Sequence, residues 1–102
     1  MKPTGTHNYY VYILTNYTKT VLYIGVTNDL ESRLDQHKTK SNPNSFIAKY
    51  NCCYLVYYER FQYIQHAIER EKELKKWSRV KKNKLIEIMN PSWSFLEEEW
   101  GL

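Results

Sequence analysis

The residue with the strongest chemical implication is Glu71, which lies in a stretch with helical periodicity. Five residues around it recur at offsets that share one side of a helix: Ile64, Ala67, Ile68, Leu74 and Lys75. Glu71 falls in the middle of that side. A carboxylate among apolar neighbours costs several kcal/mol unless a partner compensates its charge. We therefore expect Glu71 to meet a cation.

Two tyrosines are candidates to share a site. Residues 9–14 and 21–26 are rich in strand-forming types, and the short polar segment between them indicates a hairpin. Alternation places Tyr12 on one face of the first strand, and Tyr23 with Gly25 on one face of the second. If these faces coincide, the two phenols lie close together. Gly25 either permits close approach of backbone or ligand, or simply ends the strand.

An arginine and a histidine share one side of the helix expected next. Asn28 is a suitable N-cap, and Glu31 completes a capping box with it. Four residues then fall on one side at helical spacing: Leu30, Arg33, Leu34 and His37. Arg33 and His37 are either an ordinary surface pair, or a cation and a titratable imidazole directed into a cleft.

The elements that position these residues predict a small α+β domain. At 102 residues the chain is long enough for one core, so we expect one domain over 1–102, with a core of about 9–89 and an acidic, aromatic tail of 90–102. A third strand is expected at 54–59, and helices at 64–79 and 80–89. The order β-β-α-β-α-α predicts a three-stranded antiparallel sheet flanked by helices. The tail either packs on the core through its aromatic residues or stays loose.

Composition restricts the surroundings and the partners of this domain. The net charge is +4, yet residues 60–84 hold nine Lys and Arg against three Glu. Such a segment indicates a polyanionic partner or a solvated helix face. Cys52 and Cys53 are adjacent and lack metal-site spacing, which is typical of reduced thiols in the cytosol. No apolar run approaches a membrane span, so we expect a cytoplasmic protein.

Taken together, these residues resemble the GIY-YIG nuclease family, most closely its short stand-alone bacterial members. The matching positions in order are Tyr10-Val11-Tyr12, Tyr23-Ile24-Gly25, Arg33, His37, the segment from Ala67 to Lys76 around Glu71, and Asn83. Tyr10 replaces the glycine of the family's first triplet, a departure that the short members often show. Each motif alone is weak, but their order and spacing together are specific.

The resemblance implies a metal-dependent endonuclease acting on DNA, structure-guided or weakly sequence-specific, in DNA repair or recombination. It implies that Glu71 holds one Mg²⁺ or Mn²⁺ ion, that Arg33 binds the scissile phosphate, and that Tyr12 and Tyr23 handle the attacking water. Which tyrosine is the base, and whether His37 shares that role, stays open. Gly25 and Asn83 are then bracing residues. Six basic residues are expected on the DNA backbone: Lys72, Lys75, Lys76, Arg79, Lys81 and Lys82.

Two other classes of function are compatible with the sequence. One is a nucleic-acid-binding module that has this fold but does not cleave. The other is an enzyme that uses a tyrosine as covalent nucleophile on phosphate, although no cluster of basic residues surrounds Tyr12 or Tyr23 in the sequence. Targeting would come from DNA structure or from a partner protein, since no second domain is present to read bases. The sequence leaves the oligomeric state open.

Overall fold

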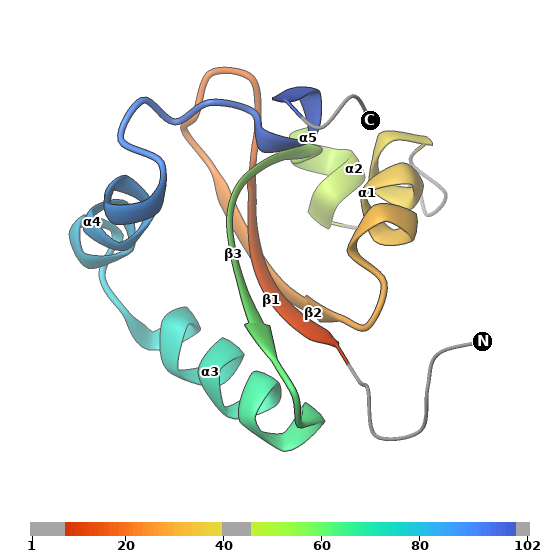
Figure 1. Cartoon of the computed structure of the whole chain (residues 1–102). Coiled ribbons are helices and arrows are strands. Elements are labelled where there is room, and N and C mark those ends of the chain that lie inside the picture. Colours follow the sequence, from red (N-terminus) through yellow and green to blue (C-terminus); the bar gives the residue numbers. More distant parts are fainter. Residues whose placement is uncertain (1–7, 40–45, 100–102) are drawn as a thin grey trace.

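Three antiparallel strands form a sheet in the order β2-β1-β3 (Figure 1). They are β1 (Tyr9–Thr15), β2 (Leu22–Thr27) and β3 (Tyr54–Phe61). The computed structural model describes residues 8–39 and 46–99, with the side chains of 37–39 left out. The three-stranded antiparallel sheet and its helices confirm the α+β fold class that the sequence predicts.

Helices cover both faces of this sheet. They are α1 (Leu30–Thr39), α2 (Phe46–Tyr50), α3 (Ile64–Lys76), α4 (Arg79–Met89) and α5 (Leu96–Glu99). In Figure 1, α3 and α4 lie on one side of the sheet and α1 and α2 on the other. The short helices α2 and α5 are additions to the predicted order, because four or five residues are too few to show helical periodicity. None of the described helices is long and apolar enough to cross a membrane.

Two helix boundaries differ from the sequence prediction. Asp29, rather than Asn28, caps α1, because its Oδ1 accepts a hydrogen bond from the Ser32 backbone N–H at 3.1 Å. The helix predicted over 64–79 ends at Lys76. Ser78 caps α4 instead, accepting from the Lys81 backbone N–H at 3.2 Å, so the chain turns between the two helices.

The apolar side of α3 is narrower than its sequence pattern predicts. Ala67 and Leu74 are fully buried against the sheet, whereas Ile68 is 39% exposed. Ala67 and Leu74 lie two turns apart on the side of the helix that faces the sheet. The Ile68 side chain points away from that side, toward solvent. The helix therefore rests on the sheet along a thin stripe, which leaves Glu71 at its border.

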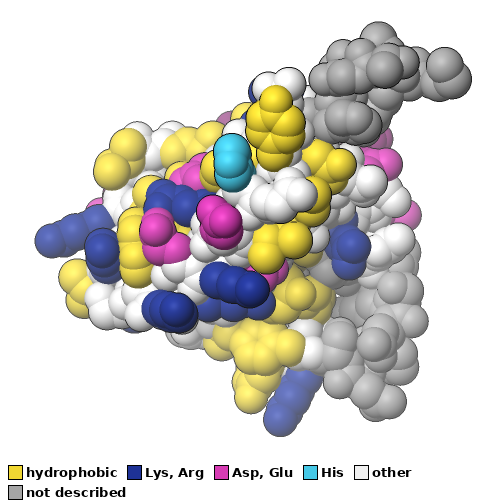
Figure 2. All heavy atoms as spheres, turned by 90° about the horizontal axis from the view of Figure 1, so that it is seen from below, with side chains coloured by type: hydrophobic (Ala, Val, Ile, Leu, Met, Phe, Trp, Pro, Cys, Tyr) yellow, Lys and Arg dark blue, Asp and Glu magenta, His cyan; other side chains and the backbone are white. Residues whose placement is uncertain are grey.

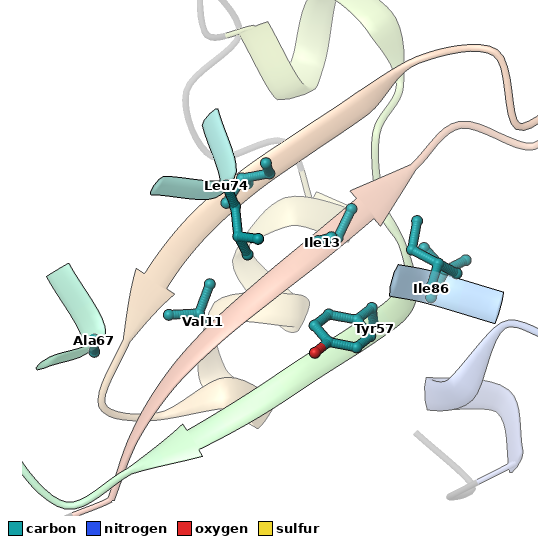
Figure 3. Close-up of a cluster of buried hydrophobic side chains, with 8 residues drawn as sticks. Val11, Ile13, Tyr57, Ala67, Leu74 and Ile86 are labelled. Carbon is teal, nitrogen blue, oxygen red and sulfur yellow. The ribbon is translucent and has the colours of Figure 1, made fainter. Parts of the chain in front are cut away.

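The sheet separates two apolar clusters. The cluster beneath α3 and α4 contains Val11, Ile13, Ile24, Val56, Tyr57, Ala67, Leu74 and Ile86 (Figure 3). The cluster on the opposite face contains Tyr12, Leu14, Leu30, Leu34, Cys52, Leu55 and Leu96. Consecutive β1 residues alternate between the two clusters, as the period-two pattern predicts. Tyr12 consequently belongs to the α1 side of the sheet.

The described part of the C-terminal tail packs on the domain. Phe95 stacks on Tyr54 with ring centroids 4.2 Å apart, and Leu96 is buried. Glu97 is fully buried, and its Oε2 accepts a hydrogen bond from the Leu55 backbone N–H at 2.9 Å. Residues 90–99 of the tail therefore pack on the core, which is one of the two arrangements that the sequence allows. Trp100 lies outside the described residues.

Candidate active site

Tyr12 and Tyr23 lie side by side on the α1 face of the sheet. The β1–β2 register pairs Tyr12 with Gly25 and Leu14 with Tyr23, which makes the two tyrosines diagonal neighbours. Their ring centroids are 6.3 Å apart. Tyr12 is only 1% exposed, whereas Tyr23 is half-buried. The two phenols thus occupy different depths of one site.

Gly25 leaves the space that the Tyr12 side chain fills. A Cβ atom added at residue 25 would overlap both the hydroxyl oxygen and the ring of Tyr12. The tyrosine ring is rigid and buried, so it cannot yield cheaply as an exposed flexible side chain would. Gly25 therefore sets the position of the Tyr12 hydroxyl. Of the two roles that the sequence allows for Gly25, the structure shows a close approach, here by a side chain.

Gly25→Ala is expected to destabilise the fold by about 1–3 kcal/mol, because overpacking forces the Tyr12 ring out of its position. The effect should depend on Tyr12. In a double-mutant cycle of chemical unfolding, Gly25→Ala should cost much less in a Tyr12→Ala background, where the ring is absent. Additive effects of the two substitutions would show that the overlap with Tyr12 is not the cause.

The electrostatics of Tyr12 place four groups in one neighbourhood. Burial raises the pKa of the Tyr12 hydroxyl well above its ordinary value, and the adjacent Tyr23 raises it further. The Arg33 guanidinium acts in the opposite direction and lowers this pKa, while the Glu71 carboxylate raises it. The four residues come from β1, β2, α1 and α3. The fold therefore brings both phenols, the guanidinium and the carboxylate within electrostatic reach of one hydroxyl.

Glu71 is less buried than the sequence pattern predicts. Its side chain is 21% exposed, and its Oε1 lies 3.4 Å from the Lys75 Nζ one turn later. The narrow stripe of α3 leaves this position at the border of the core and not at its centre. Glu71 retains access to water and to a ligand, and Lys75 compensates part of its charge.

Arg33 and His37 both belong to α1, but the structure describes only the side chain of Arg33. Arg33 lies on α1 with its side chain exposed, so its guanidinium can meet a ligand from solution. The backbone of His37 belongs to the same helix, but its side chain lies outside the described residues. The predicted contribution of His37 therefore stays a prediction.

The donor set at Glu71 restricts the kind of metal ion that fits. Across residues 8–36 and 46–99, no group of three or more His, Cys, Asp and Glu side chains could hold a metal ion. A single accessible carboxylate suits Mg²⁺ or Mn²⁺, since such hard ions keep several waters and take further oxygens from substrate phosphate. The residues present thus fit one hard divalent ion.

The six basic residues expected on DNA have different surroundings. Lys75 and Lys82 line a groove of about 290 Å³ together with Tyr23. Lys72 and Lys76 are exposed on α3, and Figure 2 shows Lys and Arg side chains interspersed with acidic ones on the surface seen from below. The Lys81 Nζ lies 4.1 Å from the centroid of the Trp77 ring.

Arg79 and Asn83 act together at the β1–β2 turn. The Arg79 guanidinium donates to the carbonyl oxygens of Thr20 and Lys19 and to the Asn83 Oδ1, each at 2.9 Å. These bonds tie α4 to the hairpin and occupy the fork of the guanidinium. Asn83 thus lies beside Arg79 at the hairpin turn.

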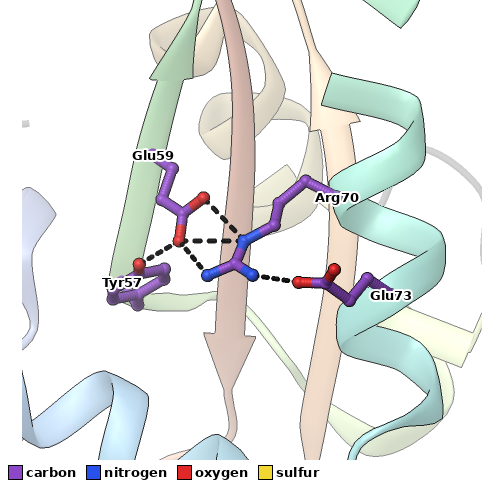
Figure 4. A network of polar contacts seen from close by, with 4 residues as sticks. All are labelled: Tyr57, Glu59, Arg70 and Glu73. Atoms are coloured by element: carbon purple, nitrogen blue, oxygen red, sulfur yellow. Dashed lines mark hydrogen bonds and ion pairs between the residues drawn. The ribbon is translucent and has the colours of Figure 1, made fainter. Parts of the chain in front are cut away.

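A polar network that local sequence patterns do not predict anchors α3 to the sheet. The Arg70 guanidinium donates to Glu59 of β3, with Nε–Oε1 and Nη2–Oε2 distances of 2.9 Å, and pairs with Glu73 (Figure 4). The Tyr57 hydroxyl donates to the same Glu59 carboxylate. Arg70 directly precedes Glu71, so this anchor restricts the rotation of α3. Only the pairing of strand and helix reveals it, because Glu59 and Arg70 belong to different elements.

The buried tyrosines make stability sensitive to alkaline pH. Burial raises the pKa of Tyr57 as it does that of Tyr12, and the Glu59 carboxylate adds to the effect. Above about pH 10 the unfolded chain loses these protons while the folded chain keeps them, so each tyrosine lowers stability by about 1.4 kcal/mol per pH unit. Thermal unfolding between pH 9 and 11 should therefore show a shallower fall for Tyr12→Phe and Tyr57→Phe than for the exposed control Tyr17→Phe. Equal slopes would contradict this account.

The three-stranded sheet with its helices, and the cluster around Tyr12, can now be compared with known protein families. The family model of the GIY-YIG catalytic domain matches residues 8–84. The chain therefore belongs to the GIY-YIG family, as the resemblance of its motifs predicted.

Known relatives cover most of the chain. A UPF0213 protein of Bacillus pumilus is 37% identical over 83 residues, which span 81% of this chain and 83% of the relative. A UPF0213 protein of Natronomonas pharaonis is 36% identical, over 78% of this chain and 91% of its own length. The solution NMR structure of a UPF0213 protein of Bacillus halodurans has a TM-score of 0.54 and 28% identity, over 84% and 89% of the two chains. The chain is thus similar to small proteins that consist of little more than this domain.

Proposed function

We propose that this protein is a divalent-metal-dependent endonuclease that hydrolyses phosphodiester bonds of DNA. The observation that carries the proposal is that Tyr23, Arg33 and Glu71, from three separate elements, lie within electrostatic reach of the Tyr12 hydroxyl. Hydrolysis of a phosphodiester needs a positioned water, stabilisation of the phosphoryl oxygens and charge compensation at the leaving oxygen. Phenol, guanidinium and carboxylate side chains together can meet these needs.

Each residue has a role that follows from its surroundings. Arg33, exposed on α1, binds two oxygens of the scissile phosphate through its planar fork. Glu71 would hold one Mg²⁺ or Mn²⁺ ion, which when bound supplies Lewis-acid stabilisation and a water of lowered pKa. Burial raises the pKa of the Tyr12 hydroxyl and so favours its protonated form, and we therefore assign this hydroxyl to donating a hydrogen bond. Tyr23 lines the groove, so its side chain is partly accessible from solution, and we assign it to orienting the attacking water.

The expected DNA contacts follow from which cations are available. Lys72, Lys75, Lys76 and Lys82 lie on the α3–α4 side and would bind phosphates without reading bases. Arg79 is engaged with the hairpin, so we assign it and Asn83 to bracing the fold. We infer one domain over residues 1–102, acting in the cytoplasm on DNA structures that arise in repair or recombination, with targeting by DNA structure or by a partner protein.

The test is incubation of the protein with supercoiled plasmid and branched DNA in Mg²⁺, Mn²⁺ or EDTA. We expect nicking that requires the ion and accelerates as salt is lowered. Salt-sensitive DNA binding that is indifferent to the ion, with no cleavage of either substrate, would favour the non-cleaving module. A covalent protein–DNA adduct trapped by denaturation would favour a tyrosine nucleophile. Cleavage in EDTA at the same rate would overturn metal dependence.

A further inference from the structure

Two large aromatic side chains are exposed on the short helix α2. Phe46 is 45% and Tyr50 40% exposed, and their ring centroids lie 4.6 Å apart. Of the five residues in this helix, Ile47 is the one that the core buries. The Phe46 ring also lies 6.0 Å from the Tyr23 ring, with 31° between the ring planes. An aromatic surface therefore extends outward from the candidate active site.

Of the two exposed aromatic residues of α2, Phe46 lines the groove of about 290 Å³. Lys75, Lys82 and residues 22–24 of β2 complete the lining. Strand β2 is at the edge of the sheet, so in the described part of the chain its outer backbone groups have no neighbouring strand. The groove thus combines a ring face, two cations and backbone hydrogen-bonding groups.

We propose that this groove binds one unpaired nucleobase of the substrate, stacked on Phe46, with its phosphate held by Lys75 and Lys82. Aromatic side chains bind bases through their faces with little sequence preference, and lysines follow the backbone. In a duplex the neighbouring pairs cover both faces of a base, so stacking requires an unpaired or extruded nucleotide. The inference rests on the proposed nuclease function for its connection to cleavage.

The groove is continuous with the catalytic residues. Tyr23 belongs to both, and Lys75 links the two because it lines the groove and its Nζ lies 3.4 Å from the Glu71 Oε1. A phosphate at Lys75 is therefore adjacent to the place where the divalent ion would bind. Cleavage is then directed to a phosphodiester beside an unpaired nucleotide, which makes the choice of cleavage site depend on DNA structure.

The test is binding in EDTA of oligonucleotides that carry one 2-aminopurine, whose fluorescence is quenched on stacking. Single-stranded DNA and a duplex with an unpaired overhang should bind with quenching, whereas the fully paired duplex should bind more weakly, through its phosphates alone, and show no additional quenching. Phe46→Ala should weaken single-strand binding about 10-fold and abolish quenching, and Phe46→Trp should retain both, since stacking on one ring contributes about 1–3 kcal/mol. Tyr63→Ala, at an exposed aromatic residue before α3, is the matched control. A parallel oligoribonucleotide series distinguishes RNA from DNA as the preferred strand.

The outcomes separate this inference from the proposed nuclease function. If the wild type nicks DNA with Mg²⁺ but Phe46→Ala binds single strands as the wild type does, the stacking site is refuted and the nuclease stands. If no DNA is cut under any condition while binding depends on Phe46, the site stands and the nuclease fails. Equal quenching in paired and unpaired DNA overturns the requirement for an unpaired base. Loss of folding in Phe46→Ala is detected by circular dichroism, and Phe46→Trp then decides.

Discussion

Glu71→Gln is expected to reduce Mg²⁺-dependent DNA cleavage by about 10³-fold or more, since it removes the charge that would hold the ion. Glutamine has the same shape but lacks the negative charge that a hard divalent ion requires. The side chain is partly exposed and its partner Lys75 is more exposed still, so the lost ion pair should change stability by less than about 1 kcal/mol. The loss should therefore appear in activity and not in folding.

Two measurements separate this explanation from a general loss of DNA binding. Plasmid nicking rates give the activity, and calorimetric titration with Mn²⁺ in the presence of uncleaved DNA reports ion binding directly. Glu69→Gln is the matched control, because it makes the same charge change at an exposed position of the same helix. Full activity of Glu71→Gln, or equal loss in Glu69→Gln, would remove Glu71 from the proposed mechanism.

Arg33→Lys is expected to lower the cleavage rate about 10²-fold although the charge is kept, because an ammonium lacks the planar fork that binds two phosphate oxygens. Replacement of Arg33 by alanine removes the positive charge as well as the planar fork. Arg33→Ala should then be slower still. Because Arg33 is exposed, neither substitution should disturb the core.

Single-turnover cleavage at saturating protein isolates this chemical effect from DNA affinity. The loss should fall on the rate at saturation and leave the half-saturating concentration nearly unchanged, since several lysines also contribute to binding. Arg60→Lys, an exposed arginine on β3, is the control. If Arg33→Lys cleaves at the wild-type rate, Arg33 contributes only its positive charge and does not bind the phosphate through its planar fork.

Local patterns in the sequence determined which elements form and which faces they present. Strand alternation allows Tyr12 and Tyr23 to share one side if the faces of the two strands coincide, and their rings are 6.3 Å apart. Helical periodicity predicts α3 with Ala67 and Leu74 against the sheet, and both are fully buried. These predictions succeed because neighbouring residues decide the side-chain direction in a strand or helix.

Competition between nearby residues limited the accuracy of boundaries. Asn28 and Asp29 are both good helix caps, and only the backbone path decides that Asp29 accepts the Ser32 hydrogen bond. The short helix α2 has no periodic signal, so local sequence patterns do not predict the aromatic surface of Phe46 and Tyr50. An aromatic pair four residues apart was the signal that could have revealed it.

Tertiary structure alone decided the chemical environment of the site. Burial raises the pKa of Tyr12, the border of α3 leaves Glu71 accessible, and the hairpin carbonyls accept hydrogen bonds from Arg79. The physical reason is distance along the chain. Secondary structure follows from residues a few positions apart, whereas burial, charge and hydrogen bonding depend on which distant segments pack together.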